Sequence, residues 1–204
     1  MAIELVKRGA KVDLTKGVAT KKFNVALGWD TNKYHGAHDF DLDVSVFMAM
    51  KAGTDPYGKD IWKVRDEEDF IFYGKTEHAT GSVIHTGDNR TGDANGDDEV
   101  IKVDFNLIPA HVEKLAFVVT IYEADARKQN FGMVSNSYVR IDNGETGEQL
   151  KRFDLGEDFS TQTGVAVCEL YKHNGEWKMN AIGAGYDNGL AGFVKDYGLE
   201  VKQQ

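Results

Sequence analysis

Short segments in which apolar residues alternate with polar or small residues recur along most of the chain. In the segment 42–47, Leu and Val alternate with Asp, Ser and Phe. Side chains of a β-strand point alternately to its two faces, so this period of two predicts strands. The segments are rich in β-branched and aromatic residues and are bounded by Gly, Asn and Asp, which also favours strands. The predicted strands are 23–29, 42–47, 100–105, 115–122, 137–141, 165–171 and 177–182.

Turn signals separate these segments, and few stretches have the period of a helix. The Asn-Gly pair at 174–175 supplies the positive φ angles that a two-residue hairpin turn needs. A longer connection is predicted at 142–147, and a long hairpin or loop in the first part of the polar region 50–69. We expect one or two helical turns at 108–114 and a short helix at 190–197.

This succession of short strands predicts the fold class. Many strands joined by frequent turns favour an all-β fold, here an antiparallel two-sheet β-sandwich with short helical segments. The sequence shows no repeat, low-complexity tail or linker. We therefore predict a single domain over residues 1–204, a length within reach of one domain.

Composition limits the classes of function. The formal net charge of −9 disfavours nucleic-acid binding, which needs a basic surface. The single cysteine, Cys168, excludes an intrachain disulfide and a thiolate metal site, and is expected as a small buried residue of a strand. Residues 1–8 lack the apolar run of a signal peptide, and no stretch approaches the length of a membrane span. A soluble cytoplasmic protein is the resulting expectation.

The segment 85–99 contains the densest group of candidate metal ligands. Glycines at 87, 92 and 96 separate its acidic and amide residues and let the backbone curl, with its carbonyls turned inward. Carboxylates crowded this closely repel one another, so a bound cation is the economical explanation. Calcium fits best, because it accepts six to eight oxygen ligands in flexible geometry. The candidate ligands are Asp88, Asn89, Asp93, Asn95, Asp97, Asp98 and Glu99.

A second acidic group lies at 39–43. If this segment is a strand, Asp39, Asp41 and Asp43 share one face. Asp30, which follows another predicted strand, is a further candidate ligand. The alternative is a solvated acidic edge of the kind that protects sheets from aggregation. Two such groups in one chain favour the metal interpretation over this alternative.

The acidic loop does not have the pattern of an EF-hand. An EF-hand that starts at Asp88 would place Arg90 at a ligand position and Asp93 at the position that requires glycine. The residues after Glu99 also alternate like a strand, so the loop is predicted to lie between strands at one end of the sandwich. Zinc is disfavoured, since His35 and His38 lie on a Gly-containing loop without a cysteine partner. Magnesium remains an alternative to calcium.

At these residues the chain resembles the TerD family of tellurium-resistance and general stress proteins, with short single-domain members such as TerD, TerE and TerZ. The resemblance covers nearly the whole chain, and the Gly-Asp-Asn…Gly-Asp-Asp-Glu loop is its most specific part. Two stretches depart from the family pattern: Ala94-Asn95, where the family has an acidic pair, and 54–62, which resembles an insertion. The matching stretches are 27–30, 39–45, 85–92, 96–99, 117–122, 129–132, 169–171, 173–178 and 183–190.

The resemblance implies a β-sandwich that binds two calcium ions at one end. It also implies a bacterial cytoplasmic protein, peripheral to the inner membrane face, that acts with other Ter-type stress proteins or a membrane-associated complex in resistance to tellurite, phage and some colicins. The calcium ligands that it implies are Asp41, Asp43, Asp88, Asn89, Asp97, Asp98, Glu99 and, less directly, Asp30.

Three functions compete on these observations. The first is a non-enzymatic calcium-binding module that orders a surface for a partner protein or an anionic headgroup. The second is a metal-dependent phosphoesterase, which requires an open coordination position and a basic clamp, and Arg90 is the only cation inside the loop. The third is direct tellurite chemistry, which calls for thiols or a redox cofactor and is disfavoured by a single cysteine. The first is the preferred prediction, since no catalytic set of residues is recognisable.

Overall fold

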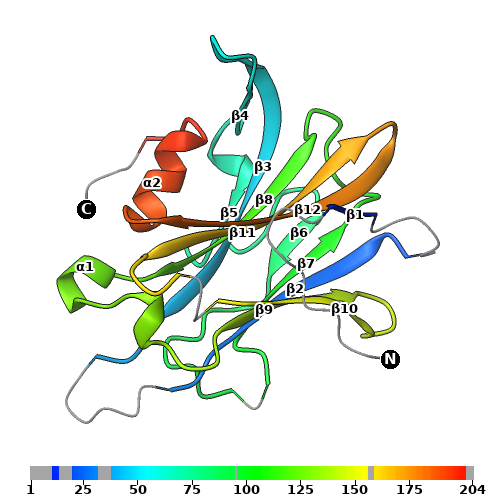
Figure 1. The fold of residues 1–204 in the computed structure, drawn as a ribbon. Coiled ribbons are helices and arrows are strands. Elements are labelled where there is room, and N and C mark those ends of the chain that lie inside the picture. The colour runs from blue at the N-terminus through cyan, green and yellow to red at the C-terminus, as the bar shows by residue number, and fades with distance from the viewer. Residues whose placement is uncertain (1–10, 14–19, 32–37, 95, 156–158, 201–204) are drawn as a thin grey trace.

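The computed structural model describes residues 11–13, 20–31, 38–94, 96–155 and 159–200. These residues form two antiparallel sheets that pack face to face as a sandwich (Figure 1). The prediction of an all-β, two-sheet antiparallel fold is therefore confirmed. The strands are β1 Lys11–Asp13, β2 Lys22–Gly28, β3 Leu42–Thr54, β4 Asp60–Lys63, β5 Phe70–Ile71, β6 Val83–His85, β7 Glu99–Asp104, β8 Lys114–Ile121, β9 Tyr138–Asn143, β10 Gln149–Asp154, β11 Gly164–His173 and β12 Glu176–Tyr186.

The larger sheet has seven strands in the order β1-β12-β11-β8-β3-β4, with β5 paired to β3 as a side branch. The smaller sheet has five strands in the order β10-β9-β2-β7-β6. Each strand predicted from alternation is present, as β2, β3, β7, β8, β9, β11 and β12. The helical segments are the 3-10 turns Glu67–Asp69 and Phe131–Met133 and the helices α1 Ala124–Arg127 and α2 Gly189–Asp196.

The predicted connections can be compared directly with the structure. The β11–β12 hairpin pairs His173 with Glu176, and both turn residues have positive φ (53° and 80°), as the Asn-Gly signal predicts. Helix α2 confirms the helix expected at 190–197. The segment 108–114 contains a single turn, closed by the Val112 N–H donating to the Pro109 carbonyl, and no helix. In the region 50–69, β3 continues to Thr54 and pairs with β4 as a hairpin that projects from the sandwich (Figure 1).

The main core lies between the two sheets. On β2, Phe23, Val25 and Leu27 are fully buried, and the alternating residues Leu42 and Val44 of β3 meet them in the same core. Because alternate side chains of β3 face inward, Asp41 and Asp43 face the opposite way. The packing of the core therefore directs these two carboxylates away from the apolar interior.

A second apolar cluster covers the outer face of the larger sheet. There Phe47, Ala116 and Val118 pack with Phe193 of α2. Phe47 also stacks on Phe70 and on Tyr197, with ring centroids 4.4 and 4.5 Å apart. This coverage explains why β8 is buried on both faces. The start of α2 lies near the acidic groups, since Gly189 and Asp43 line the same cavity.

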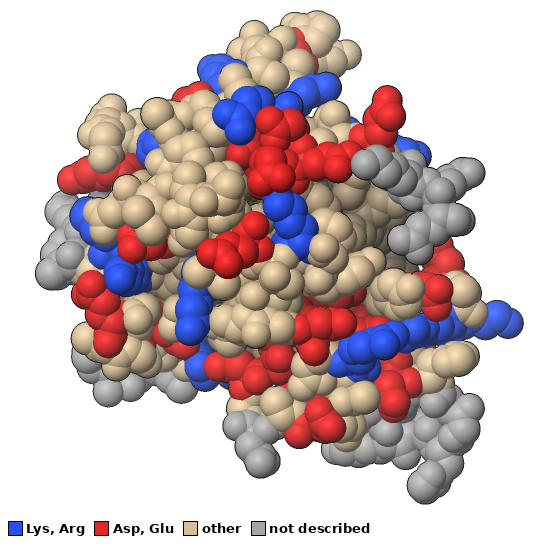
Figure 2. Space-filling model, turned by 180° about the vertical axis from the view of Figure 1, so that it is seen from behind, with Lys and Arg blue, Asp and Glu red and all other residues tan. Residues whose placement is uncertain are grey.

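The described residues also bear on the charge and membrane predictions. Acidic and basic side chains are interspersed on the face shown in Figure 2, so the net charge of −9 is not spread there as a uniform acidic surface. No helix in the described part of the chain has the length and apolar character that a membrane span requires. The predictions on residues 1–8 and on His35 fall outside the described residues.

Candidate metal centre

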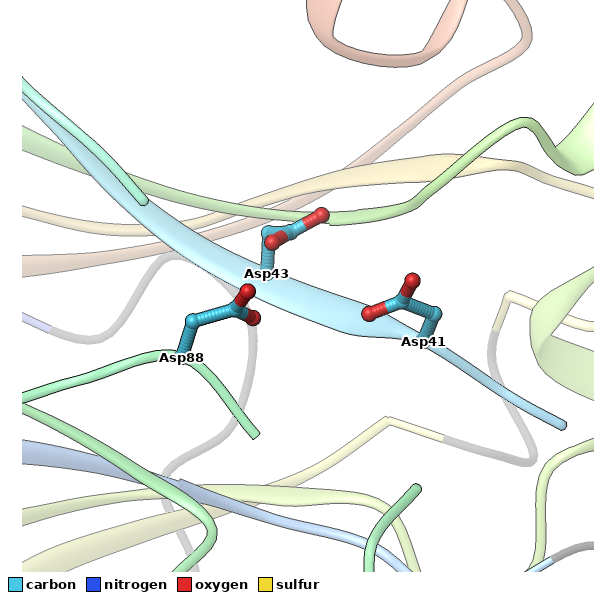
Figure 3. Close-up of side chains that lie close together, drawn as sticks. All are labelled: Asp41, Asp43 and Asp88. Atoms are coloured by element: carbon cyan, nitrogen blue, oxygen red, sulfur yellow. The ribbon is translucent and has the colours of Figure 1, made fainter. Parts of the chain in front are cut away.

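Three carboxylates from two distant segments meet at the N-terminal end of β3. Asp41 lies just before the strand, Asp43 is its second residue, and Asp88 comes from the loop after β6. One carboxylate oxygen from each of the three lies within 4.8 Å of the other two. Figure 3 shows the three side chains pointing toward a common space between β3 and the loop. Asp41 and Asp43 are buried (4% and 3% exposed), whereas Asp88 is exposed, so the group opens to solvent on one side.

Asp39 does not extend this group as strict alternation predicts. Strand β3 begins at Leu42, and Asp39 lies before it with an exposed side chain. Asp41 keeps its place because the Tyr122 N–H donates to the Asp41 carbonyl (2.8 Å), which continues the pairing of β3 with β8 by one residue. The acidic segment is therefore half strand and half loop, and only its last two aspartates enter the group.

The electrostatics of the group oppose full ionisation. Burial raises the pKa of Asp43 to about 9, and the charges of Glu99, Asp41 and Asp88 add to this effect. Burial and the charge of Asp88 also raise the pKa of Asp41, against the opposing effect of Arg127 and Arg90. Desolvation and like charges both disfavour the ionised form of a carboxyl group. The group must therefore hold a proton or a cation near neutral pH.

Glu99 lies close enough to Asp43 and Asp88 for their charges to interact, and one of its two carboxylate oxygens is unpaired among the described residues. Strand β5 pairs only with Val46 and Phe47 of β3, so the Val44 N–H is free to donate to Glu99 Oε2 (2.8 Å). Glu99 Oε1 is buried and has no hydrogen-bond partner among the described residues. Burial raises the pKa of Glu99, although His85 and the Val44 N–H lower it. An orphaned buried carboxylate oxygen beside three further carboxylates suits a cation.

His85 contacts Glu99 from the interior of the protein. Both side chains are buried, and His85 Nε2 lies 3.4 Å from Glu99 Oε2. His85 Nδ1 accepts a hydrogen bond from the Gly87 N–H (3.2 Å), which leaves Nε2 facing Glu99. Nε2 makes no hydrogen bond within the described part of the chain, so His85 offers Glu99 a close polar contact and not a bond that fixes its position.

Asp98 and Asn89 organise the loop. Asp98 Oδ2 accepts from the Trp29 N–H (2.9 Å), and Asp98 Oδ1 accepts from Asn89 Nδ2 (2.9 Å) and the Ala94 N–H (3.1 Å). Asn89 Oδ1 in turn accepts from the N–H groups of Thr91 and Gly92. Neither side chain belongs to the group that converges at Asp41, Asp43 and Asp88. Their roles as ligands stay predictions, whereas their hydrogen bonds tie the loop to the end of β2.

The other predicted ligands lie apart from this group, and two of them line a separate cavity. Asp97 Oδ2 pairs with Arg140 Nη2 (2.7 Å), and Asp97 Oδ1 accepts from the Tyr138 hydroxyl (2.9 Å). Asp30 Oδ2 accepts from Asn136 Nδ2 (2.8 Å). Asp30 and Asp93 line a cavity of about 500 Å³ together with Trp29 and Gly92. Asn95 lies outside the described residues, so its role stays a prediction.

Sequence reasoning did not single out several residues that border the three aspartates. Arg127 Nη1 lies 3.6 Å from Asp41 Oδ2, and its guanidinium stands over the Tyr122 ring at 5.0 Å. Tyr73 and Tyr122 line the small cavity above the carboxylates together with Arg90, which the sequence had already marked as the only cation of the loop. Tyr122 directly follows β8 and Arg127 ends α1, so tertiary packing alone joins them to the acidic segments. No local sequence pattern marks them.

Gly92 provides a direct test of how the loop is supported. It has φ of +69°, and an added Cβ would lie against the indole of Trp29, whose Nε1 donates to the Phe40 carbonyl. Gly92→Ala is expected to lower the free energy of unfolding by about 1–3 kcal/mol, through backbone strain and the clash with the indole. Urea denaturation in the presence of chelator measures this loss.

Gly81→Ala is the matched control. Gly81 has the same φ (+69°), but an added Cβ would have only Glu77 Oε1 nearby, at 3.9 Å. The control should therefore show backbone strain without the clash. An equal loss in both variants would contradict a supporting role for the contact between Gly92 and Trp29.

Comparisons with known proteins place this geometry in context. A family model described as the TerD domain matches residues 1–197. General stress protein 16U of Bacillus subtilis (strain 168) is 54% identical over 202 residues, which cover 98% of this chain and all of that protein. Tellurium resistance protein TerD of Serratia marcescens is 45% identical over 200 residues, 98% of each chain. A solved homologue of telluride resistance protein (TerD) from Streptomyces coelicolor A3(2) has the same fold, with a TM-score of 0.67 at 19% identity over 86% of this chain and 95% of its own.

Proposed function

Because the chain belongs to the TerD family of tellurium-resistance and general stress proteins, we propose that it is a non-enzymatic calcium-binding stress protein. The observation that carries the proposal is the convergence of the Asp41, Asp43 and Asp88 carboxylates within 4.8 Å. Calcium binding would order the acidic end of the sandwich as a contact surface. Other Ter-type stress proteins or a membrane-associated complex are the proposed partners, in the cytoplasm at the inner membrane face.

The donor set fits calcium better than the other common metals. All candidate donors are oxygens, which disfavours zinc, and the group is open to solvent at Asp88, which leaves room for the flexible coordination that calcium accepts. The ion would be held by Asp41, Asp43 and Asp88. The buried, unpaired Oε1 of Glu99 is a further oxygen close to this group. A bound divalent cation would offset the burial and the repulsion that together raise the pKa of Asp43. Asp30 and Asp93, which line the separate cavity, are the proposed location of a second ion.

Calcium titration tests the proposal. Calcium is expected to raise the unfolding temperature, because it binds the folded group better than the unfolded chain; the gain is about 2.7 kcal/mol at a free concentration of 100 Kd. Since Asp43 holds a proton below a pKa of about 9, calcium binding at pH 7 should also release protons. Calorimetry in buffers of different ionisation enthalpy measures both the binding and the proton release. The absence of binding at millimolar calcium would contradict the proposal.

A phosphoesterase is the second candidate, favoured by one observation. Arg90 and Arg127 both lie beside Asp41, at 3.8 and 3.6 Å, and together they form the basic clamp that such an enzyme requires. Release of phosphate from a panel of phosphate esters, lost in an Asp43→Asn variant, would favour the enzyme over the binding module. We expect binding without turnover.

Direct thiol chemistry with tellurite is not part of the proposal. Cys168 is buried in β11, and burial raises the pKa of its thiol far above the usual range. A buried thiol without a depressed pKa is a poor nucleophile and reductant. The proposed link to tellurium resistance therefore runs through calcium-dependent contacts.

A further inference from the structure

Two guanidinium groups and two phenol rings surround the solvent side of the three aspartates. The guanidinium groups of Arg90 and Arg127 approach the same oxygen, Asp41 Oδ2. Arg90 is held loosely, with its side chain 68% exposed, and Arg127 is packed over the Tyr122 ring. The ring of Tyr73 stands edge-on to the ring of Tyr122, with centroids 6.1 Å apart. The acidic group thus opens to solvent through a rim of arginine and tyrosine side chains.

The space above the carboxylates is larger than a calcium ion alone needs. A cavity of about 210 Å³ is lined by Asp41, Asp43, Tyr73, Asp88, Arg90 and Tyr122. A water molecule occupies about 30 Å³, so this space holds an ion and several waters, or an ion and a tetrahedral oxyanion. Among the described residues, none hydrogen-bonds to the carboxylate of Asp43, although that side chain is 3% exposed and lines the cavity.

A neighbouring cavity of about 380 Å³ continues from this one. The two share Asp43, Tyr73 and Tyr122, and the larger cavity reaches Asn188 and Gly189 at the start of α2. The Asn188 side chain does not cap the helix, and no acidic residue occupies its first turn. The first N–H groups of α2 therefore keep their positive partial charge, although Glu123 and Asp125 also line this cavity.

The coordination of a bound calcium ion would leave room for an outside ligand. Three aspartates supply three to six oxygens, whereas calcium accepts up to eight. Positions on the ion therefore remain for an outside oxygen ligand. Arginine binds phosphate oxygens through paired hydrogen bonds, which matches a phosphate group better than a simple carboxylate.

We propose that the calcium-loaded centre binds a phosphate ester, whose phosphate oxygens complete the coordination of the ion and contact Arg90 and Arg127. The organic part of the ester then lies past Tyr73 and Tyr122, toward the start of α2. The inference rests on the proposed calcium function and deepens it by naming the chemical class of the ligand. The same phosphate chemistry is available from a soluble metabolite and from a phospholipid headgroup.

Two arms of one experiment separate these sources. In the first, glycerol 3-phosphate is titrated calorimetrically into the full chain with calcium and with chelator, with glycerol as the control. In the second, the protein is sedimented with phosphatidylcholine vesicles that contain or lack phosphatidic acid, again with calcium and with chelator. We expect at least tenfold tighter phosphate binding with calcium in one or both arms. Calcium-independent binding, or no binding in either arm, would overturn the inference.

The two arginines provide the decisive variants. Arg90→Gln combined with Arg127→Gln is expected to weaken phosphate binding at least tenfold. The same double variant should bind calcium as tightly as the wild type or more tightly, because two positive charges near the ion are removed. Arg90→Gln alone repeats the test at an exposed position if the double variant does not fold. Arg65→Gln, an exposed arginine that lines neither cavity, is the matched control.

The possible results separate the two proposals. A wild-type protein that fails to bind calcium contradicts the proposed function itself. Calcium binding without calcium-dependent phosphate binding overturns only the further inference. Phosphate binding that persists in the double arginine variant also overturns it, because the clamp would then have no role.

Discussion

Replacement of Asp43 with Asn is expected to stabilise the calcium-free protein and to remove most of the stabilisation that calcium confers. In the folded calcium-free protein the pKa of Asp43 is raised from 3.8 to about 9, so folding near neutral pH takes up a proton. The unfolded chain binds fewer protons in this window, and the free energy of unfolding therefore falls as pH rises between the two values. Asparagine does not ionise, so folding of the variant takes up no proton at this position. Its free energy of unfolding therefore does not fall with pH for this reason.

The pH dependence makes the Asp43 prediction quantitative. One pKa unit corresponds to about 1.4 kcal/mol, so the advantage of Asp43→Asn in chelator should be about 1–4 kcal/mol larger at pH 8 than at pH 5. Urea denaturation at both pH values measures it. With calcium the order should reverse, because the wild type gains stability from the ion and the variant has lost a charged ligand.

Asp39→Asn is the matched control for Asp43→Asn. Asp39 lies in the same acidic segment but is exposed and outside the group of three. Its substitution should leave both the pH dependence and the calcium effect unchanged. An Asp43→Asn protein that keeps the full calcium-dependent shift would contradict the assignment of Asp43 as a ligand.

Replacement of Asp98 with Asn is expected to have the opposite effect on the calcium-free protein. The carboxylate accepts from the Trp29 and Ala94 N–H groups and from Asn89 Nδ2. Asparagine replaces one of the two accepting oxygens with an NH2 group, which is a donor. This NH2 group would meet another donor, so at least one of the N–H groups that Asp98 now accepts from would lose its partner. Hydrogen bonds to a charged acceptor contribute about 1.5–3 kcal/mol each, and we expect a loss of about 2–4 kcal/mol.

Chelator distinguishes this structural role of Asp98 from that of a metal ligand. A residue that acts only as a ligand would affect the calcium-loaded protein alone, whereas Asp98→Asn should lower the free energy of unfolding with and without calcium. Asp93→Asn is the control on the same loop, since Asp93 is exposed and its carboxylate makes no hydrogen bond with the described residues. Wild-type stability of Asp98→Asn in chelator would refute the structural role.

Length decided only part of which strands could be predicted, because β10 was missed although it has six residues, as the predicted strands β7 and β9 have. Strands such as β8 and β11 carry enough apolar and β-branched residues to be recognised locally. Short strands such as β5, with two residues, have no period that a pattern can show. They exist because a neighbour offers free hydrogen-bonding groups, as Val46 and Phe47 do for β5. Pairing of this kind is a tertiary property.

The residues of the candidate site likewise fall into those that the sequence identified and those that only the structure showed. Asp41, Asp43 and Asp88 were identified from acidic patterns within their own segments. Arg127 and Tyr122 were not, because they reach the site only through the packing of β8 against β3. The sequence also marked Asp97 and Asp98 as equal to the other acidic residues. Their distinct hydrogen bonds became visible only with Tyr138, Arg140 and Trp29 in place.

The sequence alone determined the class of fold, the two acidic segments and the glycines that let the loop turn. Those properties are local, since alternation, charge and backbone freedom are set by neighbours along the chain. The tertiary structure decided which acidic side chains converge and which hold the loop in place. That choice depends on the contact between the two sheets, which brings Glu99 to the free N–H of Val44. It also leaves the Asp43 carboxylate buried, with no hydrogen bond from any residue that the structure describes.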